Sequence, residues 1–109
     1  MNNTQRKELR VLKNKIKALK DCPRTDRRSK RTLFNVKLEL ENMVLDEEMK
    51  INNLPDNLYF SRLAERLEES LEKIEDVKCE VAGIDAAKSK EEYLSSIDKA
   101  ITSFDAILY

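Results

Sequence analysis

Residues 58–82, LYFSRLAERLEESLEKIEDVKCEVA, decide the fold, because they repeat apolar residues at helical spacing without a break. These apolar residues follow one another at steps of three or four and therefore fall on one face of an α-helix. They are Phe60, Leu63, Leu67, Leu71, Ile74, Val77 and Val81. The opposite face is rich in Glu, so we predict the central helix of a bundle, packed through one face. Gly83, the chain's one glycine, is expected to end or loosen this helix.

The preceding segment, residues 26–52, is apolar on two sides and is also predicted to be a long helix. Thr25 or Asp26 can cap its first turn. Its first apolar seam is Leu33, Val36, Leu40 and Met43, and its second is Phe34, Leu38, Leu45 and Met49. We expect other helices to contact both seams.

The clearest break in the chain is residues 52–57, NNLPDN. Asn and Asp favour turns because their side chains bond to the local backbone. Pro55 disfavours helical geometry in Leu54. Residues 26–52 and 57–82 are therefore predicted to form a long antiparallel helical hairpin.

Two shorter helices are predicted on either side of this hairpin, over residues 4–20 and 89–108. Their apolar seams are Leu9, Leu12, Ile16 and Leu19 in the first, and Leu94, Ile97, Ile101, Phe104 and Leu108 in the second. Pro23 ends the first helix, because proline disfavours helical geometry in the residue before it. Ser89 and Glu92 have the spacing of a capping box at the start of the last helix.

The composition also indicates an all-α protein. The 109 residues include one Gly, two Pro and no Trp, and 39% are charged, which is typical of long helices with solvated faces. We expect a single helical domain over residues 1–109, a three- to four-helix up-down bundle with coiled-coil-like packing, built on the long hairpin. The shorter helices would pack on that hairpin, and exchange between the two chains of a dimer would satisfy the same patterns.

Nothing in the sequence indicates secretion or membrane insertion. No apolar run is long enough to span a bilayer, and the segment MNNTQRKELR lacks the apolar stretch of a secretory signal. We expect a cytoplasmic protein without membrane contact. Cys22 and Cys79 are far apart and belong to no CxxC pair, so we expect two reduced thiols, with Cys79 near the edge of the core.

The residue types argue against an enzyme. The chain has no His, which is the commonest general base and metal ligand. One glycine cannot form a glycine-rich phosphate loop, and no nucleophile elbow or zinc pattern occurs. The central helix carries a group of acids that could suggest a metal site: Glu68, Glu69, Glu72, Glu75 and Asp76. They lie off the apolar face and are better explained as a solvated surface, so we predict no catalytic residue, metal, cofactor or small-molecule substrate.

Charge is divided between the two parts of the chain. Residues 1–38 contain 13 Lys or Arg against three acids, whereas residues 39–109 contain eight against 18. The candidate binding residues are cations of the first part: Arg6, Arg10, Lys13, Lys17, Lys20, Arg24, Arg27, Arg28 and Arg31. Three explanations remain open. These cations pair with the acidic helices of the same or a second chain, they bind nucleic acid, or they are simply solvated.

Residues 54–77, LPDNLYFSRLAERLEESLEKIEDV, place Leu-Pro-acid-Asn-Leu before a Glu-rich helix. This segment resembles a stretch found in small uncharacterised helical proteins of Gram-positive bacteria and their phages. The resemblance implies a bacterial or mobile-element setting, in which small proteins often act by binding a larger one. It implies no activity and no functional residue.

The sequence therefore favours a non-enzymatic interaction module that binds a larger protein through a charged helical face and that can be a homodimer. The alternative is a small nucleic-acid-binding regulatory or accessory protein that uses the basic first part of the chain.

Overall fold

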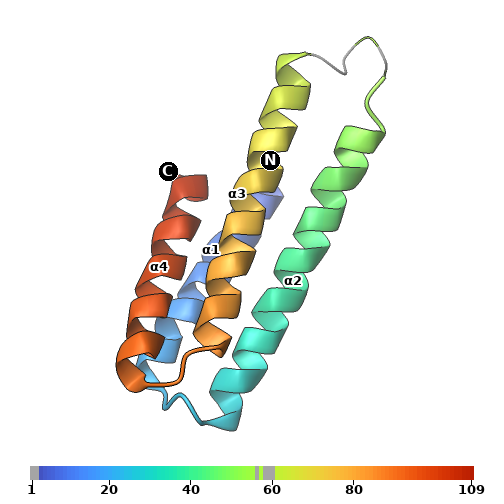
Figure 1. The fold of residues 1–109 in the computed structure, drawn as a ribbon. Coiled ribbons are helices and arrows are strands. Elements are labelled where there is room, and N and C mark those ends of the chain that lie inside the picture. Colours follow the sequence, from blue (N-terminus) through green and yellow to red (C-terminus); the bar gives the residue numbers. More distant parts are fainter. Residues whose placement is uncertain (1–2, 56, 58–60) are drawn as a thin grey trace.

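The computed structural model describes residues 3–55, 57 and 61–109 and shows antiparallel packed helices (Figure 1). Its helices are α1 (Asn3–Ala18), a short 3-10 helix η1 (Leu19–Asp21), α2 (Arg27–Asn52), α3 (Arg62–Asp85) and α4 (Lys90–Leu108). No strand occurs among the described residues. The predicted all-α bundle is therefore confirmed, and α2 and α3 form its antiparallel hairpin.

Side-chain caps explain where α2 and α4 begin. Asp26 precedes α2 in an extended conformation, and its carboxylate accepts a hydrogen bond from the Arg28 amide at 3.0 Å. Ser89 caps α4 in the same way and accepts from the Glu92 amide at 3.1 Å. The Glu92 carboxylate accepts from the Lys88 amide at 3.0 Å, one residue before the cap. The predicted capping box thus forms in a version that is one residue longer.

The start of α3 differs from the prediction. The helix begins at Arg62 rather than at residue 57, because the Ser61 hydroxyl accepts a hydrogen bond from the Ala64 amide at 3.4 Å and caps the first turn. Phe60, which we expected on the apolar face, lies outside the described residues.

The end of α3 differs as well. Gly83 lies inside the helix, which continues to Asp85, and its φ is not positive. Ile84 extends the apolar face and is buried, and this burial favours continuation of the helix. Of the two expected roles of Gly83, ending the helix is therefore wrong, and loosening it stays a prediction.

The core consists of the predicted seams, with three exchanges of neighbouring residues, and in one of them Ala100 is buried whereas Ile101 is only half-buried. The seam of α1 and the first seam of α2 are buried throughout. On α3, Leu63 is 47% exposed and Ala64 is buried in its place. On α4, Tyr93 is buried whereas Leu94 is only half-buried. The buried apolar residues of these two helices are Ala64, Leu67, Ile74, Val77, Val81, Ile84, Tyr93, Ile97, Ala100, Phe104 and Leu108.

The second seam of α2 is not covered by any described helix. Phe34, Leu38, Leu45 and Met49 are 49 to 66% exposed, and we call these four residues the outer stripe of α2. On an ideal helix they point away from the first seam, which faces the core. Within the described part of this chain, helices therefore contact only the first seam, and contact on the second seam stays a prediction.

The two cysteines are unpaired. Cys22 is half-buried and Cys79 is exposed. The expected position of Cys79 near the edge of the core is wrong, because Val77 and Val81 on either side of it take the inward positions of α3.

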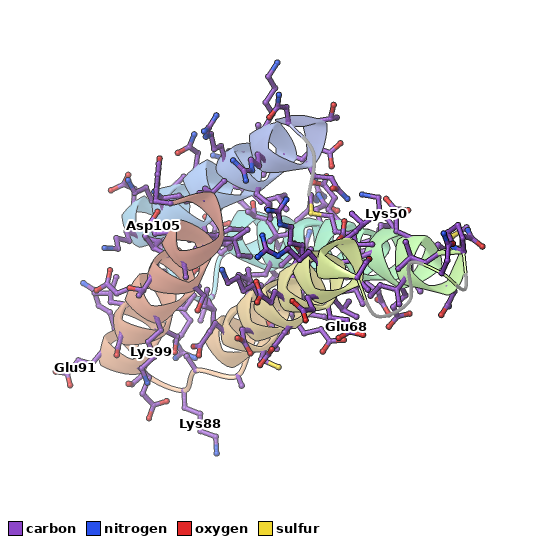
Figure 2. All side chains as sticks on the ribbon, turned by 90° about the horizontal axis from the view of Figure 1, so that it is seen from above. Lys50, Glu68, Lys88, Glu91, Lys99 and Asp105 are labelled. Carbon is purple, nitrogen blue, oxygen red and sulfur yellow. The ribbon has the colours of Figure 1, made fainter. Side chains whose placement is uncertain are left out.

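The helices form a ring in which α2 packs on α3, α3 on α4, α4 on α1, and α1 makes a smaller contact with α2. α1 and α3 therefore lie diagonally across the bundle (Figures 1 and 2). α1 has six Lys or Arg against one acid, whereas α3 has eight acids against four cations. The ring thus places its most basic helix opposite its most acidic one. The molecule measures 51 × 22 × 20 Å, and α3 extends beyond the end of α4 (Figure 1).

Candidate functional site

The basic stripe predicted on the first helix is partly used inside the fold. Lys13 Nζ forms an ion pair with Asp105 of α4 and also lies 5.4 Å from the centroid of the Tyr109 ring. Lys20 Nζ, in η1, lies 2.5 Å from Asp98 Oδ1. Figure 2 shows Asp105 where α4 meets α1. The acids that meet this stripe come from α4 and not from the Glu-rich α3.

The other members of the stripe face solvent. Arg10 and Lys17 are exposed and form no ion pair with a described residue. Arg6 lines an open cleft of about 410 Å³ between α1, α3 and the end of α4. The residues around this cleft are Arg6, Leu63, Arg66, Leu67, Glu69, Ser70, Lys73 and Ile107. The charged side chains of its lining are all exposed, and Ser70 is half-buried, so the cleft has no buried polar group that could orient a small ligand.

The remaining candidate cations gather where α2 begins. We define the basic end as Arg24, Arg27, Arg28, Lys30, Arg31 and Lys88, all of which are exposed. Arg24 joins the two loops at this end of the bundle, because its Nη1 donates to the Ala87 carbonyl at 3.3 Å. Lys88 follows Ala87 directly and points away from the bundle (Figure 2).

The cations of the basic end are placed unfavourably for an isolated chain. The amino end of a helix carries partial positive charge, so cations there oppose the helix dipole. The first turn of α2 contains no acidic residue, and Asp26 is the one acid at its cap. Arg27 and Arg31 are also one turn apart, where like charges repel. Among the described residues, no carboxylate forms an ion pair with Arg27, Arg28 or Arg31. An anionic partner would relieve this repulsion.

A buried polar network joins α1 to α2, and the sequence argument did not identify it. Glu47 is fully buried, and its Oε1 accepts hydrogen bonds from Gln5 Nε2 and Lys50 Nζ, each at 3.0 Å. Lys50 Nζ also donates to Gln5 Oε1 at 3.1 Å. Because Glu47 has no exposed surface, the network fixes a helix contact and offers no accessible site. The available signal was the spacing of Glu47 from Leu40 and Met43, which continues the first seam of α2.

Tyr93 is a second buried polar residue that the sequence argument missed. It is 3% exposed, and its hydroxyl has no hydrogen-bond partner among the described residues. Burial raises the pKa of the Tyr93 hydroxyl above its ordinary value. The nearby Ser29 hydroxyl lowers this pKa by less than burial raises it, and Cys22 raises the pKa further. Ser29 donates its own hydrogen to the Pro23 carbonyl at 3.0 Å. The group therefore stays neutral around pH 7 and supplies no charge to a site.

The acids of α3 lie on the surface of the molecule. Glu68, Glu69, Glu72, Glu75 and Asp76 are all exposed. Within residues 3–55, 57 and 61–109, no group of three His, Cys, Asp or Glu residues could hold a metal ion. None of the helices described in that part is long and apolar enough to cross a membrane.

Comparison of the chain with protein families, curated proteins and solved structures found no match. The function is therefore inferred from two features on the surface of the described residues, the basic end and the outer stripe of α2.

Proposed function

We propose that this chain is a non-enzymatic interaction module that binds an acidic surface of a larger protein through the basic end. The observation that supports the proposal is a set of exposed arginines at the start of α2 that form no ion pair with a carboxylate of the described residues. Arg27, Arg28 and Arg31 are arginines, whose planar guanidinium groups form paired hydrogen bonds with carboxylates. A carboxylate-rich partner would satisfy these groups and complement the amino end of the helix.

A protein partner suits this end better than a nucleic acid, because acids are interspersed among its cations. Asp26 caps α2, and Glu91 lies in the first turn of α4, three residues after Lys88. These carboxylates would repel a continuous phosphate backbone. They can instead pair with cations of a protein surface.

The proposed setting is the cytoplasm of a bacterium or of a phage-infected cell, where the chain would serve as an accessory protein. The resemblance of residues 54–77 to small helical proteins of Gram-positive bacteria and their phages supports this setting.

The second candidate function is nucleic-acid binding, which one specific observation favours. The exposed arginines surround a helix amino end, which is a common place for phosphate binding. Arg10 and Lys17 on α1 would add further phosphate contacts, because both face solvent.

Fluorescence anisotropy with random duplex and single-stranded oligonucleotides separates the two candidates. A nucleic-acid-binding chain would lose affinity steeply with salt, at a slope of about −0.7 to −0.9 in log affinity per neutralised phosphate. We expect no binding at about 50 mM salt, a condition under which phosphate contacts are strong. Salt-dependent binding that Arg27→Gln/Arg28→Gln/Arg31→Gln abolishes would replace the protein-partner proposal with the second candidate.

Carbodiimide crosslinking in a bacterial lysate tests the protein partner directly, because it joins lysine amines to carboxylates in contact. We expect crosslinks from Lys30 or Lys88 to acidic residues of one captured protein. The triple Arg→Gln variant at positions 27, 28 and 31 should remove them. Arg62→Gln/Arg66→Gln/Lys73→Gln on α3 removes the same charge elsewhere and should leave them intact. If both variants reduce the amount of crosslinked partner equally, the basic end is not the binding surface.

A further inference from the structure

Apolar exposure on this molecule is concentrated on one helix. Seven large hydrophobic residues are exposed in the described part of the chain, and four of them form the outer stripe of α2. Phe34 at 66% and Met49 at 60% are the most exposed of the four. Scattered apolar residues are normal on a protein surface, whereas a line of them marks an interaction surface.

The four residues of the outer stripe are spaced symmetrically along α2. Phe34 and Leu38 are one turn apart, as are Leu45 and Met49. The two pairs are symmetric about the point between Glu41 and Asn42. An antiparallel second copy with its two-fold axis at this point would place Phe34 on Met49, and Leu38 on Leu45. A symmetric contact of this kind requires a surface that is complementary to itself.

The charges of α2 point to the same orientation. Before the middle of the stripe the exposed or half-buried charges are five cations and two acids, which gives a net charge of +3, and after it they are two acids and one cation, which gives −1. The first set is Arg27, Arg28, Lys30, Arg31, Lys37, Glu39 and Glu41, and the second is Asp46, Glu48 and Lys50. An antiparallel pair places the positive half of each helix on the negative half of the other. A parallel pair would place like charges together along the whole seam.

We infer that the occupant of the outer stripe is a second copy of this chain, paired antiparallel through α2 with the two-fold axis between Glu41 and Asn42. This inference goes beyond the proposed function, which concerns the basic end. Arg27 and Arg28 lie beyond Phe34, at the outer ends of the seam, and so remain available to another molecule. A dimer therefore carries two basic ends, one at each end of the paired helices.

The contact is small, so the dimer should be weak. Four apolar side chains from each copy form less than a standard interface, which buries about 800 Å² per partner. The two Glu41 carboxylates also lie on either side of the axis and repel each other. We expect a dissociation constant on the order of micromolar, which makes the dimer depend on concentration.

Sedimentation of the full chain over a concentration series measures this dissociation constant. Leu38→Glu and Leu45→Lys should each raise it about tenfold or more, because each puts a charge against an apolar side chain twice per dimer. Both positions are exposed in the single chain, and circular dichroism melts would check that the fold is kept. Leu63→Glu on α3 changes a residue of similar exposure away from the stripe and should leave the constant unchanged.

The double variant Leu38→Glu/Leu45→Lys reports the orientation of the two helices. In the antiparallel pair each introduced carboxylate faces an introduced ammonium group, so the double variant should dimerise more tightly than either single variant. In a parallel pair it would set like charges together and dimerise more weakly than either.

Three results would overturn the inference. They are a monomer mass at every concentration up to the high micromolar range, a dimer that Leu38→Glu and Leu45→Lys leave unchanged, and a double variant that is weaker than both single variants. None of these results bears on the basic end, whose test is the crosslinking described above.

Discussion

Glu47 is a carboxylate at a core position, with one oxygen bonded twice and the other without a partner among the described residues. Glu47→Ala would leave a cavity and remove the acceptor that Gln5 and Lys50 share, so we expect a loss of about 2–4 kcal/mol in unfolding free energy. Chemical denaturation measures this loss. Glu75→Ala, at an exposed position of α3, is the control and should change the free energy by less than about 0.5 kcal/mol.

A second variant tests whether the whole network stabilises the fold or only becomes costly when it is broken. Gln5→Leu/Glu47→Leu replaces the two buried members of the network by apolar groups, which is often close to neutral, and leaves Lys50, whose side chain is 38% exposed and can reach solvent. We expect this pair of substitutions to lower the unfolding free energy by less than Glu47→Ala alone does. A larger cost would show that the network itself contributes more to stability than apolar packing does.

Tyr93 makes stability depend on alkaline pH. The neutral hydroxyl is favoured in the folded chain, and its pKa there lies above the unfolded value of about 10. The corresponding stability is present below that unfolded pKa and is lost as the pH rises through the folded pKa. Tyr93→Phe should therefore flatten the fall in unfolding free energy above about pH 10. Denaturation of both proteins from pH 8 to 11 measures the difference between their unfolding free energies. Lysines titrate in the same pH range, but both proteins contain the same lysines, so their contribution cancels in this difference. Parallel curves would contradict the prediction.

Sequence reasoning was least accurate in deciding which individual residues are buried. Periodicity identifies a face of a helix, and it correctly placed apolar residues such as Leu40 and Ile74 in the core. Periodicity does not decide which of two adjacent residues is buried when a polar residue can also fit in the core. Tyr93 is buried ahead of Leu94 at a place where Ser29 of α2 and Cys22, just after η1, lie close to its hydroxyl. Glu47 is buried because Gln5 of another helix supplies a donor.

The packing of α3 should depend on its apolar face and not on its many charges. Leu67 is 7% exposed, whereas Glu68 beside it faces solvent. Leu67→Ala should cost about 2–5 kcal/mol through lost burial and a cavity. Glu68→Gln should change stability by less than about 0.5 kcal/mol, as surface substitutions usually do. Thermal melts of both variants compare the two effects. Equal shifts in midpoint would mean that the rotation of this helix in the bundle is wrong.

At the scale of helices, the sequence predicted where the helices lie and how long they are, but it predicted less well which helices contact one another. All four long helices overlap their predicted ranges, because strong periodicity, Pro23 and the Ser89 cap are local signals. The number of neighbours around α2 is not a local property. Its second seam looked like a second contact face, and within one chain the ring closes through α1 on a different side and leaves that seam open.

The bundle should be least stable where α3 extends beyond α4 (Figure 1). Ala64 and Leu67 are the buried residues between 62 and 70, whereas residues 74–84 bury four apolar side chains. Amide hydrogen exchange is faster where fewer buried contacts oppose local opening. We expect amides of residues 62–70 to exchange faster than those of residues 74–84 in native-state exchange measurements. Uniform protection along α3 would contradict this gradient.

The whole-molecule arrangement also shows how far the candidate site followed from the sequence. The excess of cations in residues 1–38 was evident, but which of them stay free depended on the ring. Lys13 and Lys20 pair with α4 because that helix, and not α3, is the neighbour of α1. Arg27 and Arg31 remain free because the first turn of α2 lies at an end of the bundle, where no helix covers it.

The diagonal placement of α1 and α3 has a consequence for the speed of encounters. A folded chain with positive and negative sides on opposite corners feels a torque in the field of a charged molecule and rotates while the two are still apart. A larger partner would therefore meet a preferred side of this chain at first collision. Such steering acts on the association rate constant, which should fall as ionic strength rises, while the dissociation rate constant changes far less. The molecule's orientation on arrival would thus be set by helices that need not touch the partner at all.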